Sequence, residues 1–313
     1  MEVIRISFNA IAPLCVFILL GLGLNRLNVL KYESARDLTM VVFRVLLPVQ
    51  IFNSIRNADL KTAFNAKVVL FALSMYLITF FTSFYIVDRK ETDNRIKPVM
   101  IQGMFKANFT LIALPLVTSL CAQTVGIASL MVGFNCIYAN ILSVFIFCFY
   151  CGKERTVGSV IFNLVKNPII IASFLGFAFN LFHLKFPPLV EKSIIGPIAS
   201  MATPVALIAL GAALRIRSIG KYRKQAFAVV LIKLVVVPCV FIPLACLLGF
   251  RGEGLVTIAA NAATPIAVNS YSLAVAMGGD DELADIIAVL STLASMVTLF
   301  LIFCVLGLAV GFN

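Results

Sequence analysis

Three basic residues stand inside long apolar runs of the chain, where an ionisable side chain is costly and is usually functional. They are Arg44, Lys106 and Lys233. Lys106 comes just before a polar stretch that a proline interrupts, so its ammonium could pair with a carboxylate of a bound molecule. The competing interpretation for Lys106 is snorkelling, in which the long side chain reaches back to the polar boundary. For Arg44 and Lys233, snorkelling or structural pairing is favoured.

Neutral polar side chains in the same apolar runs complete a candidate binding site. Amide and hydroxyl groups can coordinate a carboxylate or an ion without carrying charge themselves. About half of them are expected to form interhelical hydrogen bonds instead. The predicted substrate-binding residues are Lys106, Asn108, Thr110, Asn135, Asn140, Asn261, Thr264 and Asn269.

Other kinds of site lack the residues that they need. The chain has one histidine, His183, and no Asp or Glu near the middle of an apolar run. It therefore offers no credible catalytic set and no cluster of metal ligands. Cys148 and Cys151 form a single C-x-x-C, which we interpret as one face of a helix rather than a redox or metal motif. We predict that the protein is not an enzyme and has no metal site and no cofactor.

The composition is that of a membrane protein. Of 313 residues, 61% are hydrophobic and 12% are charged, whereas soluble domains carry about 25% charged residues. The formal net charge of +11 does not indicate nucleic-acid binding, because the basic residues cluster between apolar runs and no stretch is both basic and aromatic. The expected partner of the surface is the lipid bilayer.

Apolar runs long enough to cross a bilayer, about 20 residues each, alternate with short polar connections. We predict an all-α polytopic membrane protein with ten transmembrane helices and no separate soluble domain. The runs centre on residues 6–25, 38–55, 67–87, 98–120, 125–150, 160–182, 194–214, 225–249, 254–277 and 284–311.

Orientation follows from the Lys and Arg residues of the connections. The loops after odd-numbered runs carry fifteen of them and the other side carries seven. Because cytoplasmic loops hold the excess, we predict a multi-pass protein of the cell membrane with both termini outside. Glu2 lies beside Arg5 and no cleavage site follows, so the first run is expected to be retained as a span.

The two halves of the chain resemble each other. The segment from Ala12 to Leu27 aligns with that from Asn167 to Phe182, and further matches follow at a nearly constant offset. Five spans per half is an odd number, so the repeats would be inverted. The expected parts are residues 1–151, a cytoplasmic linker at 152–159, and residues 160–313. The matched pairs are Pro13 with Pro168, Gly21 with Gly176, Asn25 with Asn180, Pro48 with Pro204, and Pro115 with Pro265.

Proline interrupts the fourth and ninth predicted spans. Proline removes a backbone donor and disrupts the preceding turn, and irregular backbone at membrane depth is tolerated only inside protein or along a cavity. Half-helices that start near Pro115 and Pro265 would present positive N-terminal ends, and two such ends make a site that suits an anion. A simple proline kink is the alternative for either proline taken alone. The lack of mid-span carboxylates disfavours a carboxylate proton relay and leaves sodium, protons or no coupling ion open.

Several segments in their order and spacing resemble the auxin efflux carrier family. They are NFTLIALPL from Asn108, YANILSV from Tyr138, KNPIIIASFLG from Lys166, ATPVALIALGAAL from Ala202, and the Pro265 segment. The similarity is greatest to the microbial permeases of that family, some of which carry malate or malonate. In contrast to many plant carriers, the loop between spans 5 and 6 is reduced to about Gly152 to Ser159, and Ala113 stands where a glycine is common.

The resemblance implies a 5+5 inverted-repeat fold in which helices 4 and 9 are broken and cross near Pro115 and Pro265, with a substrate site beside the crossing. It implies elevator-like alternating access, with helices 1, 2, 6 and 7 as the scaffold and the homodimer surface. On this basis Asn108, Asn140 and Asn261 are expected site residues. The predicted function is a secondary transporter of a small organic anion, a mono- or dicarboxylate. The alternatives are a membrane sensor or regulatory subunit without transport, and a carrier of a neutral or cationic solute.

Overall fold

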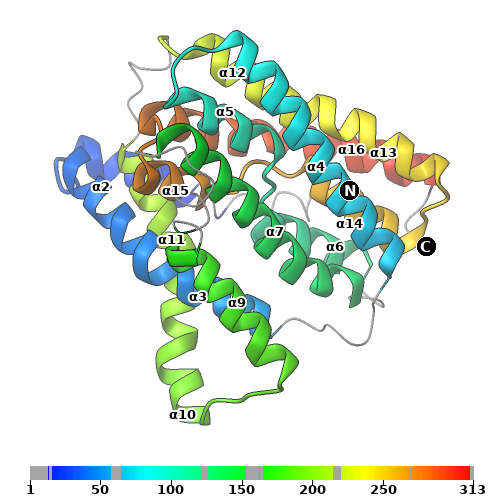
Figure 1. Ribbon diagram of the computed structural model, residues 1–313, viewed down its shortest axis with the longest axis horizontal. Helices are drawn as coiled ribbons and strands as arrows, with labels where there is room; N and C mark the ends of the chain where they lie inside the picture. The colour runs from blue at the N-terminus through cyan, green and yellow to red at the C-terminus, as the bar shows by residue number, and fades with distance from the viewer. Residues whose placement is uncertain are drawn as a thin grey trace.

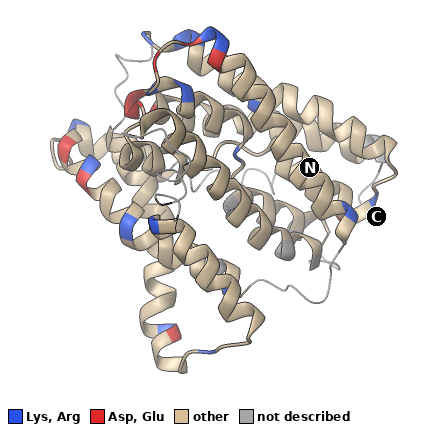
Figure 2. Cartoon of the chain, in the orientation of Figure 1, with Lys and Arg blue, Asp and Glu red and all other residues tan. Residues whose placement is uncertain are grey.

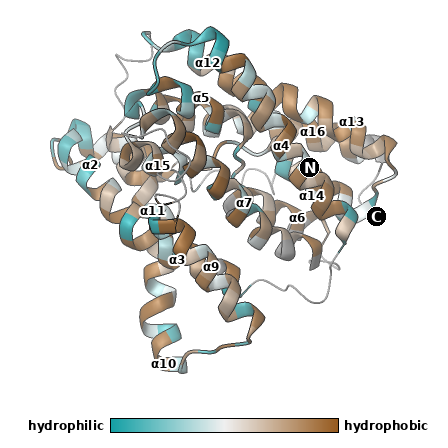
Figure 3. Ribbon diagram, viewed as in Figure 1, coloured by the Kyte–Doolittle hydropathy of each residue, from teal (hydrophilic) through white to brown (hydrophobic). Residues whose placement is uncertain are grey.

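The structure is a computed structural model, in which every regular element of the described residues is a helix (Figure 1). Charged residues gather near helix ends and connections, and the helix bodies are mostly apolar (Figures 2 and 3). This distribution is the one expected when lipid surrounds the middle of the molecule. The described residues are 13, 16–57, 65–121, 126–152, 162, 165–213, 220–267 and 269–310.

One group of helices, which we call the arm, extends away from the rest of the molecule in Figure 1. Within it α3 packs on α9, and α11 packs on α2 and α3. Its members are the helix at Val16–Arg26, α2 (Tyr32–Val41), η1 (Val42–Leu46), α3 (Leu47–Arg56), α9 (Pro168–Leu181), α10 (Pro188–Val190), η3 (Glu191–Ile195) and α11 (Gly196–Ala213).

The remaining helices form a compact group, which we call the bundle. It holds all the predicted binding residues. Its members are α4 (Ala66–Lys90), α5 (Ile96–Phe105), η2 (Phe109–Ala113), α6 (Leu114–Leu120), α7 (Gly126–Cys151), α12 (Arg223–Leu231), η5 (Ile232–Val236), α13 (Val237–Leu247), α14 (Gly252–Ala263), α15 (Asn269–Met277) and α16 (Asp281–Val310).

Five stretches of helix in the described residues are long and apolar enough to cross a membrane, and two shorter apolar helices accompany them. The chain is therefore an all-helical, multi-pass membrane protein, as predicted. The count of ten spans and the inverted repeat stay predictions. Most of the predicted linker, from residue 153 onward, lies outside the described residues.

Glycines allow the helices of the arm to approach backbone to backbone. A Cβ atom at Gly21 would overlap the carbonyl oxygen of Ile208, and one at Gly211 would overlap that of Ile18. A Cβ at Gly176 would lie 2.9 Å from the Phe52 oxygen. The first helix thus packs tightly on α11 and α9 on α3, and the two glycines that the sequence alignment paired both stand at such contacts.

A π turn precedes a proline at four places in the described residues. The turns η1, η2, η3 and η5 each end two residues before a proline: Pro48, Pro115, Pro197 and Pro238. In an α-helix a proline removes one hydrogen bond and its ring clashes with the carbonyl four residues earlier. A π turn widens the helix locally, so we attribute these turns to the prolines. The helix continues past each of them instead of ending.

Candidate functional site at the crossing of two broken helices

Two helices of the bundle are interrupted, and their interruptions touch. The chain leaves α5 at Lys106, which has extended backbone, and resumes helix at Phe109. It leaves α14 at Thr264, also extended, and resumes helix at Asn269. The backbone N–H of Asn108 donates to the carbonyl oxygen of Pro265 across 2.9 Å. One bond between the two breaks therefore joins the broken helices.

The two prolines named in the sequence analysis occupy different positions. Pro265 lies within the second break. Pro115 lies inside α6, further along the chain than the first break, and so does not stand at the crossing. The π turn η2 precedes Pro115, and its wider backbone explains why the helix continues through this proline. The first break falls instead at Lys106, Ala107 and Asn108.

Lys106 is buried beside the crossing. Its residue is 2% exposed, and its Nζ donates to Oδ1 of Asn140 on α7 across 3.0 Å. A side chain held this way does not reach a polar surface, which excludes snorkelling for Lys106 in this structure. The crossing thus contains a buried cation that is oriented by a neutral amide.

Asn261, near the end of α14, is the centre of a second polar cluster. Its Oδ1 accepts from the Tyr76 hydroxyl across 3.1 Å and from Nδ2 of Asn135 across 3.4 Å. Its main-chain oxygen and that of Ala262 lie 3.5 and 3.1 Å from Nζ of Lys233. Lys233 is 1% exposed, so it pairs structurally with the carbonyl end of the interrupted helix, where a cation is favoured.

Several buried polar atoms around the crossing have no hydrogen-bond partner among the described residues. An unpaired buried polar group costs about 1–3 kcal/mol, and native structures keep few of them. Their concentration here makes the crossing the candidate functional site of the described residues. The donors are Asn108 Nδ2, Asn261 Nδ2 and Gln102 Nε2; the acceptors are Asn135 Oδ1 and Asn269 Oδ1; the Thr264 hydroxyl can act as either.

Two further residues named in the sequence analysis, Thr110 and Arg44, add no described side chain to the crossing. Thr110 lies in η2, next to the first break, and its side chain is outside the described residues. Arg44 is exposed on η1 of the arm. Its exposure agrees with the snorkelling interpretation and separates it from the crossing.

Comparison with known families decides which family the chain belongs to. A sequence model of the family described as "Membrane transport protein" matches residues 6–157 and 153–303, almost the whole chain. The chain belongs to this family. This is the family of the auxin efflux carriers and related permeases, so the resemblance seen in the sequence is confirmed. The protein is a membrane transporter and not an enzyme.

A relative in the archaeon Methanothermobacter thermautotrophicus agrees with this assignment. It is described as an uncharacterized transporter and is 25% identical over 299 residues, which cover 94% of this chain and 96% of the relative. The similarity extends across both broken helices.

Two residues at or near the site were missed by sequence reasoning. Tyr76 and Gln102 lie in apolar runs in which a lone polar group gave the only signal. Lys233 was noticed, but its contact with α14 cannot be inferred from local sequence. Asp285, which the sequence placed near a span end, is 2% exposed, and its Oδ1 has no partner among the described residues.

Proposed function

We propose that the protein is a secondary transporter that moves a small organic anion, a mono- or dicarboxylate, past the crossing of its broken helices. The observation that carries the proposal is the position of Lys106. Its ammonium is buried where α5 is interrupted, and the two breaks, residues 106–108 and 264–268, contain no Asp or Glu. A carboxylate is the ligand that a cation among unpaired amide donors would bind most strongly.

The unpaired atoms also describe the rest of the ligand. The amide nitrogens of Asn108 and Asn261 can donate to carboxylate oxygens. Oδ1 of Asn135 lacks a donor, and it belongs to a side chain that contacts Asn261. A hydroxyl or an undissociated acid group on the substrate would satisfy that oxygen. A dicarboxylate or hydroxy acid therefore fits these atoms better than a purely apolar anion.

Alternating access is proposed to move the bundle against the arm. The arm is tied together by glycine contacts and by the ion pair of Arg56 with Glu191 at 2.9 Å. Few polar contacts join it to the bundle, among them the Tyr32 hydroxyl donating to Asp281 at 2.7 Å. A rigid arm with a small set of breakable polar contacts suits an elevator-like movement.

The arrangement in the membrane follows the same proposal. We place the chain in the cell membrane as ten spans in two inverted halves, with both termini outside. Helices 1, 2, 6 and 7, which correspond to the arm, would form a homodimer surface. The arm exposes large apolar side chains, including Leu27 and Leu189, and a second copy or lipid would cover them.

Uptake into proteoliposomes tests the function. We would measure labelled malate, malonate and simple monocarboxylates with the unmodified protein, with Lys106→Gln and with Lys166→Gln. Lys166 is an exposed lysine outside the crossing, packed over the Phe162 ring. It therefore controls for the loss of one positive charge.

We expect saturable uptake by the unmodified protein. The apparent affinity should be at least about tenfold weaker in Lys106→Gln, because a charge-assisted hydrogen bond is worth about 1.5–3 kcal/mol. The affinity of Lys166→Gln should be unchanged. Unchanged affinity in Lys106→Gln would remove Lys106 from the site. No uptake of any anion by folded protein would contradict the substrate class and favour a neutral or cationic solute, or a sensor without transport.

A further inference from the structure

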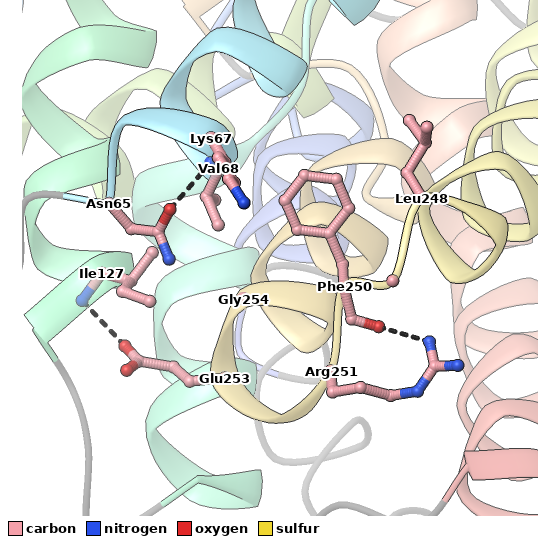
Figure 4. A pocket seen from close by; sticks show the side chains of 10 residues that line it. Asn65, Lys67, Val68, Ile127, Leu248, Phe250, Arg251, Glu253 and Gly254 are labelled. Atoms are coloured by element: carbon pink, nitrogen blue, oxygen red, sulfur yellow. Dashed lines mark hydrogen bonds between the residues drawn. The ribbon is translucent and has the colours of Figure 1, made fainter.

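A cavity lies at the opposite end of α14 from the crossing. It has a volume of about 420 Å³ and is lined by the starts of α4 and α14 together with the turn that precedes α14 (Figure 4). The helix α14 has 12 residues, so about 18 Å separate this cavity from the crossing. A volume of this size suits a small molecule. No part of the proposed transport site lines it.

Donors and positive charge dominate one wall of the cavity. Lys67, in the first turn of α4, makes no hydrogen bond or ion pair within the described part of the chain. Asn65 accepts from the Val68 N–H with its oxygen, which leaves its amide nitrogen as a donor toward the space. In Figure 4 the ammonium of Lys67 and this amide lie on the same side of the cavity.

The turn before α14 supplies further donors. Gly249 and Gly252 have φ values of +82° and +53°, a conformation that glycine adopts without strain. Arg251 stands at the start of α14 without a side-chain cap on the helix, so the first N–H groups of α14 carry no such partner. The positive end of α14 thus lies at the cavity. The guanidinium of Arg251 donates to the carbonyl oxygens of Phe250 and Cys246 across 2.7 and 3.0 Å and points away from Lys67 (Figure 4), so it holds the turn and is not a donor to the cavity.

The single carboxylate of the cavity is already engaged. Oε1 of Glu253 accepts from the backbone N–H groups of Ile127 and Ala128 across 2.8 and 3.2 Å. Its negative charge lies against the positive end of α7, which compensates it. Within the described residues Glu253 makes no ion pair with Lys67, so the ammonium of Lys67 is available to an anionic group in the cavity.

The remaining wall is apolar. It consists of Val68, Ile127, Leu248 and Phe250. The Phe250 ring is held in place by Phe71, with ring centres 5.2 Å apart. A ligand that fills this space would have an apolar body on one side and an anionic group on the other.

From these features we infer that the cavity at the start of α14 is a second binding site, distinct from the crossing, for a small monocarboxylate with an apolar body. The carboxylate lies between Lys67 and the N-terminus of α14, and the apolar body rests on Phe250 and Leu248. The site does not depend on the proposed transport function.

The reactivity of Lys67 reports on this site directly. We would acetylate the purified full-length protein with a water-soluble amine reagent and follow each lysine by mass spectrometry. The probe is benzoate, and benzamide is the uncharged control of the same shape. Lys185 and Lys192, which are exposed on the connection that leads into α11 and do not line the cavity, are the internal controls.

We expect benzoate to slow the acetylation of Lys67 about threefold at about twice its Kd and to leave Lys185 and Lys192 unchanged. Benzamide should protect Lys67 much less. Glu253→Gln, which keeps an oxygen for capping α7 and removes the negative charge, should strengthen the protection. The variant Lys106→Gln should leave it intact.

Three results would overturn the inference. Benzoate up to about 10 mM, where millimolar affinity is visible, could leave Lys67 unprotected. Benzamide could protect as well as benzoate, which would mean that charge is not recognised. Protection could vanish in Lys106→Gln, which would make it a consequence of binding at the crossing. Each of these measurements is independent of uptake. A failure of this inference can therefore be distinguished from a failure of the transport proposal.

Discussion

The arm and the crossing bury polar and backbone groups in opposite ways. In the arm, glycines bring backbones into contact, and polar groups such as Arg56 and Gln50 are joined to partners across helices by bonds of 2.9 and 2.8 Å. At the crossing, helices are interrupted and donors and acceptors of Asn108, Asn135 and Asn261 are left unpaired. Both regions lie inside an apolar chain, but within the described residues the arm has one buried atom without a partner, Nε of Arg56, and the crossing has six.

This difference separates a supporting role from a binding role. Unpaired buried groups reduce stability, and a sequence keeps them where another molecule completes them. The two buried lysines show the same contrast on a smaller scale. Lys233 donates to main-chain oxygens and completes a helix end, whereas Lys106 donates to a side-chain amide that can rearrange.

Enlarging a glycine of the arm should have the largest effect. Gly211→Leu would drive a side chain into the Ile18 backbone, and we expect a loss of more than about 3 kcal/mol of stability or no folded protein. Gly23→Leu is the matched control, because a Cβ at Gly23 meets no atom within 4 Å. Thermal unfolding and size-exclusion chromatography in detergent measure both variants. Equal behaviour of the two would show that the close approach does not determine stability.

Removing the lysine that completes α14 should have the next largest effect. Lys233→Met leaves the carbonyl oxygens of Asn261 and Ala262 without this donor, and we expect a loss of about 1–3 kcal/mol. Lys106→Met should lose less stability and more uptake. Unfolding temperatures and uptake of the two variants, compared side by side, test the contrast. A Lys233→Met protein as stable as the original would contradict the structural role of Lys233.

Breaking the ion pair of the arm should cost less. Glu191 is 41% exposed at its side chain whereas Arg56 is 5% exposed, so solvent screens part of the attraction. For Arg56→Gln we expect a loss of about 1–2 kcal/mol and unchanged substrate affinity, measured by thermal unfolding and by uptake. A change in affinity without a change in stability would place Arg56 in the transport cycle.

The smallest effect is expected where the arm meets the bundle. Tyr32→Phe removes the bond to Asp281, which is worth about 1.5–3 kcal/mol at most and less at a hydrated surface. If this contact must break during transport, the uptake rate should rise by about two- to fivefold with little change in stability. A fall in rate would indicate that the contact supports the moving state instead.

The sequence predicted much of the fold and of the candidate site, and its errors have physical causes. Composition and run length gave a multi-pass helical protein, and Pro265 lies between α14 and α15, where the helix is interrupted. Pro115 lies at no such interruption, because a π turn lets a helix continue through a proline, and no local pattern announces such a turn. Lys106 was found because a charge in an apolar run is conspicuous. The link between Lys233 and α14 depends on tertiary packing, which spacing along the chain does not specify.

The π turns also have a consequence for how such chains can change over evolution. A π turn holds one residue more than the same length of α-helix requires, so each behaves as an insertion inside a helix. Loss of that residue, together with loss of the proline after it, would restore an α-helix and keep the later side chains on their original faces. In relatives that lack Pro48, Pro115, Pro197 or Pro238, we therefore expect a single-residue deletion within the turn that precedes the missing proline.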